Sequence, residues 1–249
     1  MTRRFYVEPP ALESDEIALD GALAHRLAKV LRLRTGDDIT LFDGSGVEVR
    51  ATLEHLSDKR ATAAVSERSA GLEEPRVAVH LYQSITKGER FEWLLEKGTE
   101  IGVASFTPMI TARAVVKTNE GAPRIDRWRR IVVEAAEQCG RSAVPTVGAP
   151  LSFDRALSAD QAVVLLPYED AGAAAPAIAE ALNNEIDALF AMSAVNVLIG
   201  PEGGYDPAEV EQATAAGAIV VTMGRRVLRS ETAGLVAATL VLQVVGELG

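Results

Sequence analysis

The sequence predicts an α/β fold in two parts: a small, mainly β domain over residues 1–72, followed by an α/β domain over residues 73–249. Two strand-like runs around a glycine turn characterise the first part. In the second part, strand-like and helical runs alternate, which is typical of a parallel sheet with helices on its faces. Both patterns are interrupted at residues 71–75, Gly-Leu-Glu-Glu-Pro, which we interpret as the domain boundary.

The composition is that of a folded chain, because 48% of its 249 residues are hydrophobic, enough for a sizeable core. The single cysteine, Cys139, excludes an intrachain disulfide and fits a reducing, cytoplasmic location. The first ten residues contain no apolar run, so no secretory signal is expected, and no stretch is long enough for a membrane span. The net charge of −10 argues against a nucleic-acid partner, although local basic patches remain compatible with one.

In the first domain we expect a helix over residues 21–33, a hairpin over 39–53 that turns at 43–46, and a further strand over 60–65. One face of the expected helix is basic. A solvated helix face is the simplest reading, but its combination with a small β domain favours RNA contact. The basic residues are His25, Arg26, Lys29 and Arg32.

In the second domain, strands are predicted over residues 77–82, 105–110, 163–166, 195–199 and 219–222. Helices are predicted over residues 89–101, 127–140, 176–189, 207–216 and 231–248. Asp126 and Ser230 are the predicted N-caps of the second and the last of these helices.

A glycine-rich turn, Gly-Pro-Glu-Gly-Gly at residues 200–204, directly follows the apolar run at 195–199. In an open α/β sheet, ligands bind at the carboxyl ends of the strands, where such turns lie. Glu202 is unexpected in a phosphate-binding turn, and no lysine accompanies it, so a neutral or cationic ligand fits better than a polyphosphate. The turns after residues 166 and 222 share this edge, although any α/β domain needs such connections.

Three arginines, Arg225, Arg226 and Arg229, come just before the apolar helix predicted at 231–248. Cations are unfavourable at a helix start, so an acidic partner such as RNA phosphate, Glu202 or Glu231 is expected nearby, unless these are ordinary surface arginines. The helix itself is apolar on nearly all sides and must be buried in the domain or against a second subunit.

The helix predicted over residues 127–140 places Glu134, Gln138 and Arg141 on one stripe, a pattern that simple helix surface pairing also explains. Cys139 on this helix is interpreted as a buried small side chain rather than a nucleophile. The three histidines are far apart without metal-ligand spacing, so metalloenzyme and hydrolase interpretations are weak.

The segments at 198–204 (Leu-Ile-Gly-Pro-Glu-Gly-Gly), 223–224 and 227–233 (Val-Leu-Arg-Ser-Glu-Thr-Ala) resemble the C-terminal signature of the SPOUT methyltransferases. The motifs at 4–7, 25–32, 86–88, 96–102 and 134–141 occur in the order typical of one SPOUT family, the ribosomal RNA small subunit methyltransferase E family. The resemblance therefore covers essentially the full length of the chain.

The resemblance implies a methyltransferase that uses S-adenosyl-L-methionine to methylate N3 of a uridine in the decoding region of 16S rRNA, in the small ribosomal subunit or its assembly intermediate. It further implies a PUA-like β-barrel before the α/β domain, a C-terminal trefoil knot that holds the cofactor, and a homodimer. No metal is expected to take part.

The resemblance also suggests site residues. Glu202 is the predicted acceptor of the uridine proton, and Arg229 the predicted stabiliser of developing negative charge. The predicted cofactor-binding residues are Leu198, Ile199, Gly200, Pro201, Gly203, Gly204, Met223, Gly224, Val227, Leu228, Ser230, Thr232 and Ala233. The predicted RNA-binding residues are Arg3, Arg4, His25, Arg26, Lys29 and Arg32 for phosphates, and Lys87, Arg113, Glu134, Gln138 and Arg141 near the target base.

Other functions remain compatible with parts of the sequence. A SPOUT enzyme acting on tRNA or on a ribose 2′-hydroxyl is the main alternative, although the expected barrel and the motif at 134–141 weigh against it. A non-catalytic RNA-binding assembly factor is a second, and a cofactor-binding titration separates it from an enzyme. A nicotinamide dehydrogenase is a third, but the chain lacks G-x-G-x-x-G.

Overall fold

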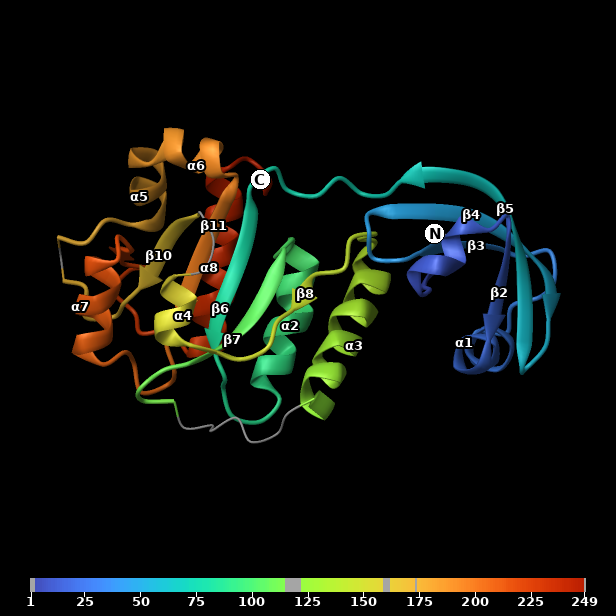
Figure 1. Ribbon diagram of the computed structural model, residues 1–249, viewed down its shortest axis with the longest axis horizontal. Coiled ribbons are helices and arrows are strands. Elements are labelled where there is room, and N and C mark those ends of the chain that lie inside the picture. The colour runs from blue at the N-terminus through green and yellow to red at the C-terminus, as the bar shows by residue number, and fades with distance from the viewer. Residues whose placement is uncertain (1–2, 115–121, 159–161, 173, 249) are drawn as a thin grey trace. The chain divides into compact units, whose positions relative to one another are not determined.

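The computed structural model describes residues 3–114, 122–158, 162–172 and 174–248. The chain divides into two compact units (Figure 1). The first unit comprises Met1–Glu74 and Val133–Val144, and the second comprises Pro75–Val132 and Pro145–Gly249. The division after residue 74 lies close to the boundary expected after residue 72. The segment 133–144, in contrast, folds with the first unit, although the sequence pattern assigns it to the second.

The first unit is built on a five-stranded sheet with the order β1-β3-β4-β5-β2. Only the β1–β3 pair is parallel, and the other pairs are antiparallel. The predicted hairpin is formed by β3 and β4. Its turn is tight because the Asp43 carboxylate accepts hydrogen bonds from the backbone and hydroxyl of Ser45, while Gly44 and Gly46 adopt φ of +86° and +96°. The strands are β1 (Arg3–Tyr6), β2 (Glu16–Asp20), β3 (Asp38–Phe42), β4 (Val47–Leu56) and β5 (Arg60–Ala70).

The helical part of the first unit is shorter than predicted. The 3-10 turn η1 (Pro9–Glu13) precedes β2, and α1 (Gly21–His25) continues as a single π-type turn, η2 (Arg26–Val30). Helix formation stops before Arg32, whose φ of +54° is incompatible with a right-handed helix. Leu27 is fully buried in the core cluster that also contains Phe5 and Ile39, so the basic face of the helix is left toward the surface.

Segment 133–144 completes the first unit through backbone and side-chain contacts. Glu137 accepts a hydrogen bond from the Tyr6 amide, and Ser142 lies between Arg4 and Glu48. Burial raises the pKa of the Glu48 carboxyl, but hydrogen bonds from Ser142 and Arg4 and the charge of Arg4 outweigh it, so the net shift is downward. The Ser142 carbonyl also accepts from the Gly46 amide.

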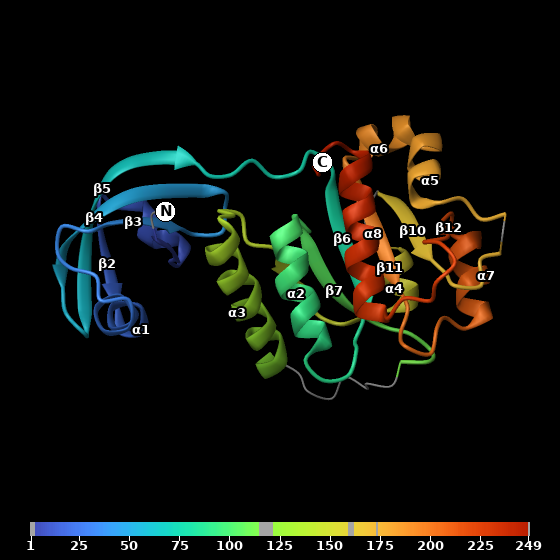
Figure 2. The same ribbon diagram turned by 180° about the vertical axis from the view of Figure 1, so that it is seen from behind.

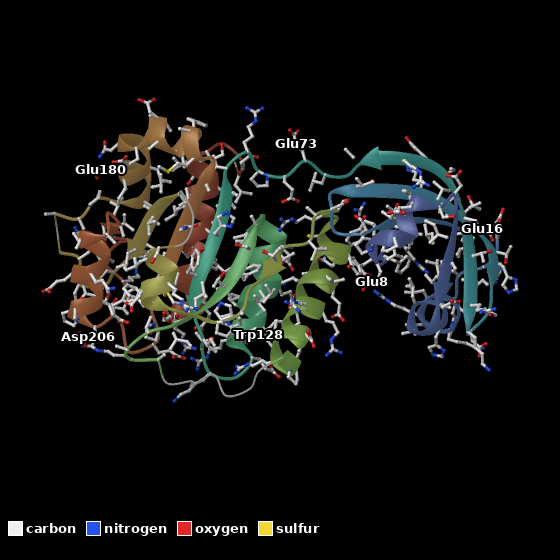
Figure 3. The ribbon with its side chains drawn as sticks, in the orientation of Figure 1. Glu8, Glu16, Glu73, Trp128, Glu180 and Asp206 are labelled. Atoms are coloured by element: carbon white, nitrogen blue, oxygen red, sulfur yellow. The ribbon has the colours of Figure 1, made fainter. Side chains whose placement is uncertain are left out.

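The helix α3 (Ala122–Cys139) supplies this segment and begins earlier than predicted. Asp126 therefore lies inside the helix, and its predicted role as N-cap is wrong. The reason is Pro123, which is favoured in a first helical turn, where its missing amide hydrogen costs nothing. In the second unit, Trp128 of α3, labelled in Figure 3, is buried. Its ring packs on that of Phe91 with ring centroids 4.4 Å apart.

The second unit contains a parallel sheet of order β12-β10-β11-β6-β7-β8, with β9 also paired to β7. Strand β10 is a continuous apolar run and β11 is one apart from Asn196, as expected for strands covered on both faces. Strands β10, β11 and β12 match their predicted positions within two residues. The strands are β6 (Ala78–Ser84), β7 (Ser105–Ile110), β8 (Thr146–Val147), β9 (Leu151–Ser152), β10 (Val163–Pro167), β11 (Ala194–Ile199) and β12 (Ile219–Val221).

Helices α2 (Arg90–Ile101) and α8 (Ser230–Val244) lie side by side on one face of this sheet (Figure 2). Ala237, Ala238 and Val241 of α8 are fully buried, which confirms the predicted burial of this apolar helix. Ser230 is its first helical residue and not its N-cap, a position that Arg229 occupies without a side-chain cap. The N-cap prediction for Ser230 is thus wrong, because its hydroxyl is engaged elsewhere.

The remaining helices are short. The helix predicted over residues 176–189 is two helices, α5 (Ile178–Asn184) and α6 (Ile186–Met192), separated by the non-helical Glu185. Helix α7 (Pro207–Ala215) starts with a capping box of Asp206 and Glu209. The segment α4 (Phe153–Leu157) precedes β10.

No helix of the described residues is long and apolar enough to cross a membrane. Strand order alone does not define a knot, so the trefoil knot stays a prediction.

Candidate active site

The carboxyl ends of β10, β11 and β12 are neighbours in the second unit, as the sequence predicts for a ligand-binding edge. The loops that leave them meet the start of α8 around a cavity of about 260 Å³. The lining residues are Pro167, Tyr168, Glu169, Ile199, Gly200, Pro201, Glu202, Gly204, Tyr205, Thr222, Met223, Gly224, Arg226, Val227, Leu228, Arg229, Ser230 and Ala233.

Two glycines of the β11 loop bring the backbone close to neighbouring side chains. A Cβ on Gly200 would lie 3.0 Å from the ring of Tyr205, and one on Gly204 would lie 2.2 Å from a carboxylate oxygen of Glu169. Gly204 also adopts φ of +68°, which disfavours any other residue. Burial raises the pKa of the Tyr205 hydroxyl well above its ordinary value, so this residue is neutral in the cavity wall.

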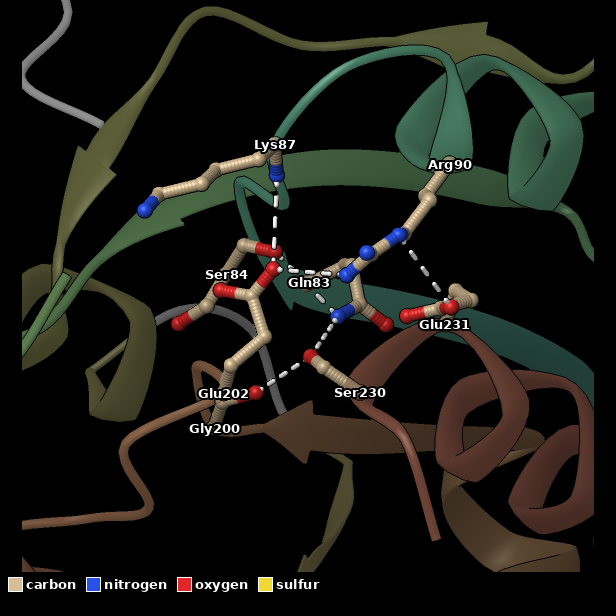
Figure 4. Close-up of polar contacts among 8 residues, drawn as sticks. All are labelled: Gln83, Ser84, Lys87, Arg90, Gly200, Glu202, Ser230 and Glu231. Carbon is tan, nitrogen blue, oxygen red and sulfur yellow. Dashed lines mark hydrogen bonds and ion pairs between the residues drawn. The ribbon is translucent and has the colours of Figure 1, made fainter. Parts of the chain in front are cut away.

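A buried hydrogen-bond chain ties the β11 loop to α8 and β6 (Figure 4). The Gln83 amide donates to the Ser230 hydroxyl at 2.7 Å, and this hydroxyl donates to the Gly200 carbonyl at 2.5 Å. Gln83 and Ser230 are 1% and 5% exposed, so both groups depend on these partners. These two hydrogen bonds hold the Gly200 end of the β11 loop in place against α8 and β6.

Arg90 lies between two carboxylates at the mouth of the site (Figure 4). Its Nη1 is 3.3 Å from Oε1 of Glu202, and its Nε is 3.8 Å from Oε1 of Glu231. The Lys87 amide donates to the same Glu202 oxygen at 3.4 Å. Arg90 therefore links the start of α2 to both the β11 loop and α8, a role that sequence patterns do not reveal.

Most of the predicted cofactor-binding residues line the cavity, and three do not. Leu198 is fully buried in the core of the sheet, Gly203 lies against Arg113, and Thr232 lines a neighbouring hollow. Six other lining residues are outside the predicted cofactor-binding and catalytic sets, although the sequence predicts a turn after residue 166 and an arginine cluster that includes Arg226. These are Pro167, Tyr168, Glu169, Tyr205, Thr222 and Arg226.

The residues predicted to bind phosphate all lie in the first unit, most of them exposed. Arg3, His25, Lys29 and Arg32 are exposed, while Arg4 is half-buried in its ion pair with Glu48. Arg26 is exposed and paired with Glu137, with its Nη1 2.8 Å from Oε2 of that residue. A basic face is thus present, partly neutralised by acidic neighbours. Its contact with RNA stays a prediction.

The residues predicted to approach the target base are in different surroundings. Lys87 and Arg113 are exposed in the second unit, where Arg113 pairs with Asp206 at 3.3 Å. Arg141, in the first unit, is 4% exposed and its guanidinium is held by Glu74, so it is a buried structural pair. Glu134 and Gln138 are exposed on α3.

Comparisons with known protein families agree with this architecture. Residues 73–242 match the model described as the RNA methyltransferase domain, and residues 19–66 match the RNA methyltransferase PUA domain. The fold and site therefore define an RNA methyltransferase. The Bacillus subtilis ribosomal RNA small subunit methyltransferase E is 31% identical over 94% of each chain. The chain belongs to the ribosomal RNA small subunit methyltransferase E family.

Solved structures extend the comparison to the bound cofactor. A ribosomal RNA small subunit methyltransferase E from Neisseria gonorrhoeae, bound to S-adenosylmethionine, is 32% identical with a TM-score of 0.83 over 98% of each chain. A Legionella pneumophila protein in complex with the same cofactor is 28% identical with a TM-score of 0.78, again over 98% of each chain. The predicted family and two-part α/β architecture with a PUA domain are confirmed.

Proposed function

We propose that this protein methylates N3 of a uridine in the decoding region of 16S rRNA, with S-adenosyl-L-methionine as the methyl donor. The observation that carries the proposal is the cavity where the loops after β10, β11 and β12 meet, in a chain of this family. The protein acts in the cytoplasm as a homodimer on the small ribosomal subunit or its assembly intermediate.

The cavity fits S-adenosylmethionine better than a nucleotide phosphate. Its glycines leave room for close contact with backbone groups, and Met223, Val227 and Leu228 offer apolar surface to an adenine ring. Glu169 and Glu202 supply carboxylates, which suit hydroxyl and ammonium groups and repel phosphate. When bound, this cofactor supplies an electrophilic methyl group on a positively charged sulfur.

The chain must provide two functions for methylation at N3, because a neutral uracil nitrogen has to lose its proton. A base accepts the proton, for which a carboxylate is suited, and a cation stabilises the negative charge on the uracil oxygens. Arg229 is exposed at the cavity and is our candidate for the cation. Glu202, the acceptor predicted from the sequence, also lines the cavity, but its Oε1 already faces Arg90.

Phosphate contacts come from the basic face of the first unit. Arg3, His25, Lys29 and Arg32 are its exposed members with no carboxylate ion pair among the described residues. Backbone contacts of this kind position RNA without reading its sequence, so they supply affinity rather than target choice. Choice of the uridine then depends on the second unit, where the cofactor cavity lies.

The proposal is tested by incubating the purified protein with labelled S-adenosylmethionine and small subunits from cells lacking this methylation. We expect label in 16S rRNA and a single modified nucleoside that co-elutes with N3-methyluridine. Label in tRNA or on a ribose 2′-hydroxyl would assign the chain to another RNA target. Absence of cofactor binding in calorimetry would favour a non-catalytic assembly factor. Sedimentation of the same sample tests the homodimer.

A further inference from the structure

A second hollow, of about 630 Å³, lies next to the cofactor cavity, and Arg229 lines both spaces. Its walls come from the loop after β6, the first turn of α2 and the start of α8. A molecule in this hollow would be adjacent to a methyl donor in the cofactor cavity. Among the residues that line it are Arg90, Trp93, Arg229, Glu231 and Thr232.

One carboxylate oxygen of Glu231, which lines this hollow, lacks a hydrogen-bond partner among the described residues. The residue is only 7% exposed, and its Oε2 is buried without a hydrogen-bond partner among the described residues. Its Oε1 lies at 3.8 Å from Arg90, too far for a strong hydrogen bond. A buried acceptor without a donor costs about 1–3 kcal/mol or more when charged, so the carboxylate is stabilised if a rotation of its side chain brings this oxygen to a donor on a bound molecule.

The hollow combines this acceptor with cationic donors, namely the guanidinium groups of Arg90 and Arg229. The Watson–Crick edge of uracil has the complementary order: a carbonyl acceptor, the N3–H donor and a second carbonyl acceptor. Cytosine has no hydrogen on N3 and would place a lone pair against the carboxylate. The charge pattern of the hollow therefore favours uracil over cytosine.

Trp93 adds an aromatic surface to the same wall. Its side chain is 45% exposed, unlike the other tryptophan of the chain, Trp128, which is 1% exposed. RNA-modifying enzymes reach a base by extruding it from its stack, and extruded bases stack on aromatic side chains. Such stacking contributes about 1–3 kcal/mol per base.

We infer that this hollow receives the target uracil and that Glu231, rather than Glu202, accepts the N3 proton. The inference rests on the proposed function. The Glu231 carboxylate takes the proton, and the N3 lone pair forms the bond to the methyl carbon. The bond between that carbon and sulfur breaks, with its electron pair remaining on sulfur, and Glu231 later releases the proton to solvent. Arg90 is a positioning residue that orients both carboxylates.

Single-turnover methylation of 16S rRNA separates the two carboxylates. At saturating cofactor, Glu231→Gln should slow the chemical step about 10²-fold to 10⁴-fold, whereas Glu202→Gln should act mainly on cofactor affinity and slow the chemical step less than Glu231→Gln does. Raising the pH ionises uridine N3 directly, so it should increase the methylation rate of Glu231→Gln by a larger factor than that of the wild type. Glu180→Gln, an exposed carboxylate on α5 outside the hollow, is the matched control. The opposite ranking of the two variants would overturn the assignment and return the role to Glu202.

Base binding is measurable without catalysis. Quenching of Trp93 fluorescence by uridine oligonucleotides should occur in the cofactor-free protein and be weaker with cytidine oligonucleotides. Trp93→Ala should weaken oligonucleotide binding about 5-fold or more, and Trp93→Phe should largely preserve it. The stacking role would be overturned if Trp93→Ala and Trp93→Phe bound the oligonucleotides equally well. It would also be overturned if sedimentation showed that oligonucleotide binding was lost only because the dimer of the variant had dissociated. A wild-type protein that methylates no rRNA would instead refute the proposed function itself.

Discussion

Removal of one hydroxyl should weaken both the stability of the second unit and its cofactor affinity. Ser230→Ala deletes the donor to the Gly200 carbonyl and the acceptor of the Gln83 amide. Gln83 keeps a second acceptor, the Ser84 carbonyl at 3.2 Å, so the main loss falls on Gly200. A polar group left without its partner costs about 1–3 kcal/mol.

In a unit of this size, each kcal/mol lowers the melting temperature by roughly 2–4 °C, so a decrease of about 2–12 °C is expected. Because Gly200 belongs to the cofactor loop, loss of about 1–3 kcal/mol from the bound state would weaken S-adenosylmethionine binding about 5-fold to 150-fold. Thermal denaturation and calorimetric titration with the cofactor measure the two effects.

The matched control is Thr239→Ala on the same helix. The Thr239 hydroxyl is exposed and bonds only to the Leu235 carbonyl one turn earlier, so its loss should change neither quantity appreciably. If Ser230→Ala behaves like Thr239→Ala in both assays, the hydrogen bonds of Ser230 do not hold the cofactor loop.

Further outcomes follow from single features. Gly98→Ala should destabilise the protein by up to about 2 kcal/mol in urea, because its Cβ would lie 2.6 Å from the buried Phe106 ring and overpacking outweighs the roughly 1 kcal/mol gained in helix propensity. The raised pKa of Tyr205 contributes stability below pH 10.0 that is lost as pH rises through its folded-state pKa. Tyr205→Phe should therefore lose less free energy of unfolding than the wild type as the pH rises into the alkaline range. An equal loss in both proteins would contradict this expectation. Arg26→Ala should weaken rRNA binding and reduce by about 1 the steepness of the plot of log binding constant against log salt concentration. Unchanged binding and steepness would mean that Arg26 only pairs with Glu137.

Elements with a strong local signal were predictable from the sequence. Strands β10 and β11 are mainly apolar runs that end at Pro167 and just before Gly200, and α7 begins at an Asp-Pro pair with Glu209 in place for a capping box. These features depend on residues close together in the chain. The loops around the cavity were predictable for the same reason, because each glycine turn follows such a strand.

Elements that depend on distant partners were not predictable. Strands β1, β8 and β9 are too short to show a period, and β1 exists because it pairs with β3. The break between α5 and α6 comes after two asparagines with low helix propensity, which periodicity alone does not detect. The contact of Arg90 with Glu202 and Glu231 joins three separate segments, and nothing local in the sequence indicates it.

The discontinuity of the first unit determines how the protein can be dissected. A gene fragment that stops at residue 74 would omit the piece of chain that supplies Glu137 to the Tyr6 amide and the Ser142 carbonyl to the Gly46 amide. Such a fragment would expose unpaired backbone and be prone to aggregate. An isolated first unit should instead fuse residues 133–144 through a short linker to residue 74, which keeps β1–β5 and adds the segment that completes them in one continuous polypeptide.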